Sequence, residues 1–162
     1  MGTDVTASAI VAIEDLPPLL AREARLLGLD LGTKTIGMAL SDVTRSVATP
    51  LRTLKRGKFT ADAKELADVI EQNQVGALVI GMPFNLDGTE GPRAQSTRAF
   101  ARNLGQHIQV PIVFWDERLS TAAVERHLIE ADASRKRRAE VIDRMAAAYI
   151  LQGALERLRR LA

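Results

Sequence analysis

The 162-residue chain contains no cysteine, only two histidines and 4% aromatic residues. The missing cysteines exclude disulfides, thiolate nucleophiles and cysteine-based zinc sites. A bound metal ion would therefore have to be held by carboxylates or by the two histidines. The low aromatic content argues against a platform that stacks single-stranded bases, so phosphate contacts and shape would have to dominate any binding of nucleic acid.

Long apolar runs are missing as well. No run approaches the roughly 20 residues that span a bilayer, and the N-terminus, with Asp4, has neither the basic start nor the long apolar core of a secretory signal. We therefore expect no membrane partner and a cytoplasmic location. The composition, with 46% hydrophobic and 26% charged residues, is typical of a globular protein of about one domain. The formal charge of +2, with the basic residues clustered, leaves room for a polyanionic partner.

The pattern divides the chain into an extension and one domain. Residues 1–25 mix small, acidic and proline residues without a sustained period, which predicts a partly flexible N-terminal extension with one short helical turn after Pro17-Pro18. Residues 26–162 form the domain. Its expected strands are a pair within 26–40, then 46–54, 75–81 and 110–115; its expected helices are one capped by Thr60, then 92–107, one from Ser120 or Thr121 to 131, and 139–161.

This order of elements predicts an α/β fold built on a five-stranded mixed sheet with helices on both faces. The first three strands are joined by short turns and should form an antiparallel meander. The first, fourth and fifth strands should be parallel through right-handed crossovers. In the last helix Val141, Ile142, Met145 and Tyr149 outline an apolar stripe, and the small residues 146–148 would let the helix approach the glycine-rich first strand closely.

Acidic residues stand at the ends of two parallel strands. Asp30 interrupts an apolar run, and Asp116-Glu117 follows the fifth strand. Ligands gather beyond the carboxyl ends of such strands, so these acids should lie at one edge of the sheet. A structural alternative for Asp30 is a hydrogen bond to the amides of the Gly32-Thr33 turn.

Two or three carboxylates in a partly buried site repel one another, and a divalent cation relieves that repulsion. Oxygen ligands select Mg²⁺ or Mn²⁺. Asp143 on the last helix is the natural third ligand, with a surface ion pair to Arg144 as its alternative. Of the two neighbours after the fifth strand, only one can face the site; we favour Glu117, with Asp116 paired to Arg118.

Several motifs in this order resemble the YqgF family, the Holliday-junction-resolvase-like proteins regarded as nucleases for the 5′ end of pre-16S ribosomal RNA. The motifs are Gly28-Leu29-Asp30-Leu31-Gly32-Thr33-Lys34-Thr35-Ile36-Gly37-Met38-Ala39-Leu40-Ser41-Asp42, Gly81-Met82-Pro83, Asp87-Gly88-Thr89-Glu90-Gly91, Asp116-Glu117-Arg118-Leu119-Ser120-Thr121, and Asp143 with Ala146-Ala147 and Ile150-Leu151-Gln152. The resemblance implies a ribonuclease H-like fold and a divalent-metal phosphodiesterase with Asp30, Glu117 and Asp143 as its acids. Thr35 stands where many family members carry arginine.

Basic residues near these acids are candidate contacts to nucleic acid. Lys34 follows Asp30 in the first turn, and Arg93 follows the loop 85–91, whose amides precede a helix. Arg118 and the loop Arg135-Lys136-Arg137-Arg138 complete the set. The alternatives are an exposed turn lysine, a tight turn and a solvated charge run. His107 and His127 lack metal-ligand spacing, and we expect them at the surface.

Three functions stay open at this point. The first is a nuclease for precursor ribosomal RNA or, as its variant, a resolvase of branched DNA. The second follows from Asp30-Leu31-Gly32-Thr33, which also resembles the first phosphate loop of actin-like sugar kinases and ATPases, although this chain is too short for their two-domain cleft. The third is a non-catalytic module that binds nucleic acid. The sequence does not decide whether the substrate is RNA or DNA, or whether the protein is a monomer or a homodimer.

Overall fold

The computed structural model describes residues 9–119 and 135–162, with side chains at 9–119 and 144–162. Within these residues the chain forms a five-stranded mixed sheet of order β3-β2-β1-β4-β5. Strands β1 to β3 are antiparallel, and β4 and β5 continue the sheet parallel to β1. The α/β class and the mixed sheet are thus confirmed. The strands are β1 (Arg25–Leu31), β2 (Thr35–Ser41), β3 (Ala48–Lys55), β4 (Val75–Met82) and β5 (Ile112–Asp116).

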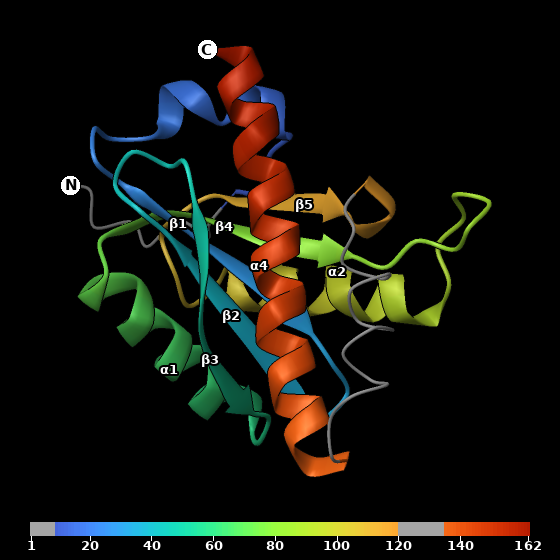
Figure 1. Cartoon of the computed structure of the whole chain (residues 1–162). Helices are drawn as coiled ribbons and strands as arrows, with labels where there is room; N and C mark the ends of the chain where they lie inside the picture. Colours follow the sequence, from blue (N-terminus) through green and yellow to red (C-terminus); the bar gives the residue numbers. More distant parts are fainter. Residues whose placement is uncertain (1–8, 120–134) are drawn as a thin grey trace.

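Helices cover both faces of the sheet. Figure 1 shows α4 (Arg135–Leu161) crossing one face, with α1 (Phe59–Gln72) and α2 (Pro92–Leu104) on the other. Successive strand residues point to opposite faces: Leu27 and Leu29 join the apolar core under α1 and α2, whereas Leu26 joins the core under α4. We call these two sides the α1/α2 face and the α4 face.

A glycine on β1 sets how closely α4 lies on the sheet. A Cβ at Gly28 would be 2.8 Å from the Cβ of Leu151 and 3.0 Å from the carbonyl oxygen of Ala147. The predicted close approach of the alanine-rich helix to β1 is therefore confirmed. Of the predicted apolar stripe, Tyr149 is partly buried and packs against the core under α4, and the side chains of Val141 and Ile142 lie outside the described residues. The fully buried positions of the described helix are Ala147, Ile150, Leu151, Ala154 and Leu155.

The start of α4 also differs from the prediction. The helix begins at Arg135 and not at Ala139, so the expected basic loop 135–138 is its first turn. Arginine and lysine are good helix formers, and neither glycine nor proline interrupts this run. The helix expected from Ser120 or Thr121 lies outside the described residues.

At the start of α1 a buried carboxylate replaces the expected cap. Thr60 lies inside α1, which begins at Phe59. Asp62, which is 5% exposed, instead accepts the amide of Gly57 at 3.2 and 3.1 Å. A carboxylate in the first turn is also favoured by the helix dipole. Asp62 thereby fixes the turn between β3 and α1.

Part of the predicted extension packs on the domain. Residues 13–15 and 17–19 form short 3-10 turns, the second beginning at Pro17 itself. Leu16 is fully buried in the core under α4. Ile10 forms a parallel bridge with Ile112, which covers the outer edge of β5. Across the described residues no helix has the length and apolarity that a bilayer crossing requires.

The contact at Gly28 yields a stability prediction. Gly28→Ala should lower the free energy of unfolding by about 1–3 kcal/mol, because the added methyl group overpacks the helix-to-sheet contact. Urea unfolding followed by circular dichroism measures the change. Gly57→Ala is the matched control, since the nearest atom to a Cβ there is 4.0 Å away. Equal stability of the two variants would contradict the prediction.

Candidate functional site

The carboxylate of Asp30 is buried on the α4 face. Asp30 is 2% exposed and follows Gly28 on the same side of β1. An ionised carboxylate that loses its water requires compensating donors or a cation. Of the two turn amides in the structural alternative for Asp30, that of Gly32 donates to the Thr35 carbonyl oxygen at 2.8 Å.

Glycines flank Asp30 on both neighbouring strands. On β2 the residue opposite Asp30 is Gly37. On β4, Ile80 lies beside Leu29, so the next residue, Gly81, lies beside Asp30. Adjacent strands are about 4.7–4.9 Å apart, and residues level with one another share a face. At Gly81 the missing side chain leaves room on the α4 face for the side chains of Ile150 and Glu117, whose nearest atoms are 2.5 and 2.9 Å from where a Cβ would stand.

Glu117 reaches this space from β5. It begins the 3-10 turn η3 (Glu117–Leu119) directly after the strand. A Cβ at Gly81 would be 2.9 Å from Oε1 of Glu117 and 3.2 Å from its Cγ. The Glu117 carboxylate therefore lies over Gly81. Because Gly81 is beside Asp30, the two acids lie at the ends of β1 and β5 on the same face. Their role as metal ligands stays a prediction.

Asp116 points the other way and is engaged by the protein. Arg118 donates to it from Nη2 at 2.7 Å and from Nε at 3.0 and 3.1 Å. The same guanidinium lies over the Phe84 ring, 5.5 Å from its centroid, and donates to the Leu86 carbonyl oxygen at 3.4 Å. The hydrogen bonds from Arg118 hold the pKa of Asp116 below its ordinary value. The predicted pair of Asp116 and Arg118 is thus confirmed, while a nucleic-acid contact by Arg118 stays a prediction.

The third predicted acid is placed only by its backbone. Asp143 lies on α4 one helical turn before Ala147, the residue whose carbonyl oxygen approaches Gly28. Its side chain is outside the described residues. Among the side chains that are described, no group of three or more acids or histidines is close enough to hold a metal ion. The side chains of 135–138 and the whole of His127 also lie outside the description.

The turn after β1 is held by Arg56, the residue that directly follows β3. Lys34 is exposed in this turn. Arg56 donates its backbone amide to the Lys34 carbonyl oxygen at 2.9 Å and its Nη1 to the Gly32 carbonyl oxygen at 2.6 Å. The role of Arg56 was missed at the level of sequence. The only signal was a cluster of basic residues after the third strand, to which no contact could be assigned.

The loop before α2 is a tight turn that uses its own amides. Gly88 donates to the Asn85 carbonyl oxygen, and Thr89 donates both its amide and its hydroxyl to Asp87. Gly88 has a φ of +88°, a conformation that glycine adopts without strain. These bonds favour the tight-turn alternative for residues 85–91. Arg93, the second residue of α2, is exposed.

His107 has a structural contact. It is exposed, and its ring packs edge-on against Phe59 at 5.6 Å between centroids. This agrees with the surface position that we expected.

The chain is similar in sequence to a known family of proteins. The profile of the RuvX family, described as Holliday junction resolvase, matches residues 24–157. The chain belongs to the RuvX family. Among curated relatives of this RuvX chain, a Methylocella silvestris protein named "Putative pre-16S rRNA nuclease" is 58% identical over 155 residues and 96% of both chains. A Roseobacter denitrificans protein of the same name is 68% identical over 136 residues and 83% of both chains.

Two solved structures share the fold of the RuvX chain. RuvC of T. thermophilus in complex with a Holliday junction substrate aligns with a TM-score of 0.52 and 13% identity, over 83% of this chain and 94% of that chain. The yeast mitochondrial Holliday junction resolvase aligns with a TM-score of 0.52 and 12% identity, over 92% of this chain and 84% of that chain. These likenesses confirm the ribonuclease H-like fold.

The ion pair at the end of β5 yields a pH-dependent prediction. Arg118→Met should lower the free energy of unfolding slightly near neutral pH, because an ion pair at the surface contributes little. A carboxylate with a lowered folded pKa stabilises the protein above its unfolded pKa, and that stabilisation is lost as the pH falls through the folded pKa. The difference from wild type should therefore shrink at acid pH. Urea unfolding from about pH 7 to about pH 2 measures it.

Arg102→Met is the control for this measurement, because Arg102 is exposed on α2. Its effect should be small at every pH. A penalty for Arg118→Met that is the same in neutral and acid buffer would contradict the prediction.

Proposed function

We propose that this RuvX-family chain is a divalent-metal-dependent nuclease, a hydrolase of phosphodiester bonds, with Asp30, Glu117 and Asp143 as its metal ligands. The observation that carries the proposal is the convergence of Asp30 and Glu117 over Gly81 on the α4 face. This place lies at the carboxyl ends of parallel strands, where open α/β sheets bind ligands. Figure 1 shows the arrowheads of β4 and β5 side by side at that edge.

The chemistry of the donors fits Mg²⁺ or Mn²⁺. Two carboxylates in a buried space repel each other, and oxygen donors prefer hard cations. When bound, such an ion polarises a phosphoryl oxygen and makes a bound water more acidic. Asp30 and Glu117 would hold it from neighbouring strands, and Asp143 would complete the set from α4. Burial of Asp30 strengthens each of these interactions by excluding water.

Basic residues around the acids would bind the substrate backbone. Lys34 is exposed on the turn that follows Asp30, and Arg93 is exposed at the start of α2. The four basic residues Arg135, Lys136, Arg137 and Arg138 form the first turn of the helix that carries Asp143. Phosphate contacts of this kind supply affinity and position without reading sequence.

For the substrate we favour precursor ribosomal RNA. The relatives that are 58% and 68% identical over most of the chain carry the name of a pre-16S rRNA nuclease. Branched DNA is the second candidate, and the description of the RuvX family as Holliday junction resolvase supports it. A resolvase would be expected as a two-fold dimer, whereas a nuclease for an RNA end can act as a monomer.

Substitution of the acids tests the proposal. Asp30→Asn and Glu117→Gln should each lower Mn²⁺-dependent cleavage at least about 100-fold, since a metal ion contributes several kcal/mol to the transition state. Asp116→Asn should keep most of the activity, because Asp116 pairs with Arg118 and is not a proposed metal ligand. Cleavage rates on matched pre-16S RNA and four-way-junction DNA substrates distinguish the two candidate substrates.

Asp68→Asn, on the exposed side of α1, is the control for loss of one negative charge. Cleavage by Asp30→Asn at the wild-type rate, or wild-type cleavage in the absence of any divalent ion, would sink the assignment. Faster cleavage of the junction than of the RNA would favour the second candidate.

Gly81 should be needed for the metal site. The Cβ of Gly81→Ala would lie 2.5 Å from Cδ1 of Ile150 on α4 and 2.9 Å from Oε1 of Glu117, so both side chains would have to shift. We expect Mn²⁺ affinity, measured by calorimetry, to fall about 10-fold or more. Gly57→Ala is the control for a glycine-to-alanine change, because the nearest atom to a Cβ there is 4.0 Å away. The same Mn²⁺ affinity in both variants would contradict this role of Gly81.

A further inference from the structure

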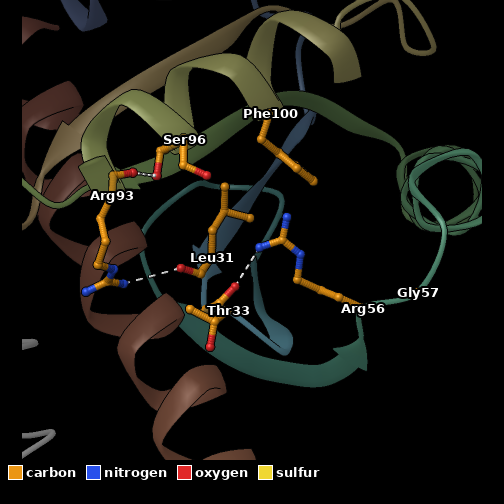
Figure 2. A pocket seen from close by; sticks show the side chains of 9 residues that line it. Leu31, Thr33, Arg56, Gly57, Arg93, Ser96 and Phe100 are labelled. Atoms are coloured by element: carbon orange, nitrogen blue, oxygen red, sulfur yellow. Dashed lines mark hydrogen bonds between the residues drawn. The ribbon is translucent and has the colours of Figure 1, made fainter. Parts of the chain in front are cut away.

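A second concave site lies at the end of β1 on the α1/α2 face. It is a pocket of about 450 Å³ between the turn after β1, the turn before α1 and the start of α2. Leu31 and Phe100 form its apolar part, and Arg56, Arg93 and Ser96 its polar part. Figure 2 shows the two arginine side chains on opposite sides of Leu31. We call this cavity the β1-end pocket.

Both arginines are anchored and retain donors. Arg56 uses Nη1 for the Gly32 carbonyl oxygen at 2.6 Å, and its guanidinium lies 5.3 Å from the centroid of the Phe100 ring. Arg93 uses Nη2 for the Leu31 carbonyl oxygen at 3.4 Å. A guanidinium carries five N–H donors, so each arginine has donors left over. The 2.6 Å bond and the ring contact restrict the Arg56 side chain before a ligand arrives, which reduces the entropy lost on binding.

The charge of the β1-end pocket is not neutralised by its lining. Among the residues that the structure describes, neither an aspartate nor a glutamate lines it. Arg98 on the same helix α2 is held by Glu90 at 2.7 Å, and Arg118 by Asp116 at 2.7 Å. Among the described residues, by contrast, no ion pair involves Arg56 or Arg93. Two fixed guanidinium groups beside a serine hydroxyl are donors that match the oxygens of a phosphate.

We propose that the β1-end pocket binds a phosphate of the nucleic-acid strand, next to the phosphate that is hydrolysed at Asp30. The ligand class rests on the proposed function. Leu31 in the pocket directly follows Asp30, and the two residues face opposite sides of β1. A nucleic-acid strand that crosses the end of β1 would therefore contact both the acids and the β1-end pocket.

The pocket fits a backbone phosphate and its sugar better than a free nucleotide. A site for a free nucleotide normally offers the base a surface for stacking. In the β1-end pocket, Arg56 lies against the Phe100 ring and Phe59 packs edge-on against it at 5.5 Å between centroids. The one aromatic ring of the lining is thus already in contact with the protein.

Binding of a short single-stranded RNA tests this proposal. In the Asp30→Asn background, which removes cleavage as a complication, Arg93→Gln should weaken RNA binding about 5- to 10-fold near 0.1 M salt. The slope of log K against log salt should fall by about 0.7, the value for one lost contact to a single strand. Fluorescence anisotropy over a salt series measures both. Arg102→Gln is the matched control, since it removes one exposed arginine from the same helix outside the pocket.

Each outcome decides the proposal. Equal slopes for Arg93→Gln and Arg102→Gln would overturn it. Inorganic phosphate and AMP test whether the pocket binds a free ligand instead. Their binding is followed by the amide chemical shift of Ser96. If either one binds there and leaves the RNA affinity unchanged, the pocket serves a free ligand and the proposal fails. Failure of the proposed function gives a different result. If Arg93→Gln weakens RNA binding but the wild-type chain cleaves no substrate, the phosphate-binding role of the pocket stands and the nuclease assignment falls.

Discussion

The buried carboxylate of Asp30 is the constraint on which the arrangement of the site depends. It is held on the face that α4 covers, at 2% exposure, with Gly37 and Gly81 on the strands to either side. Gly28 allows α4 to lie directly on the same strand. A buried carboxylate is costly unless donors or a cation compensate it. The glycines around Asp30 provide the space in which Glu117 and a cation can approach.

The end of β1 then connects two sites of opposite charge. Acids face the α4 side of the strand, and the anchored Arg56 and Arg93 face the other side. A cation-dependent centre beside a separate phosphate contact is a sensible arrangement for a phosphodiester strand, because the contact fixes the register of the strand while the acids act on one phosphate. Membership of the RuvX family agrees with such a substrate.

Local patterns predicted the sheet and the position of its acids. The strand-end rule placed Asp30 and Glu117 at one edge, and the two-residue alternation separated Glu117 from Asp116. Long-range contacts were not predictable from the sequence. Glycine at position 81 has the same sequence signature whether it ends a strand or makes room for a carboxylate from β5. The anchoring of Arg56 on the first turn is likewise invisible, because it joins residues 24 positions apart.

The central claim is that Asp30 and Glu117 hold one divalent ion. The most direct measurement is the anomalous scattering of Mn²⁺ in crystals of the wild-type chain. The account predicts a peak about 2.1 Å from carboxylate oxygens of both Asp30 and Glu117, with Asp143 as a further ligand. A saturating Mn²⁺ concentration that gives no peak between these two residues, or peaks only elsewhere on the chain, would contradict it.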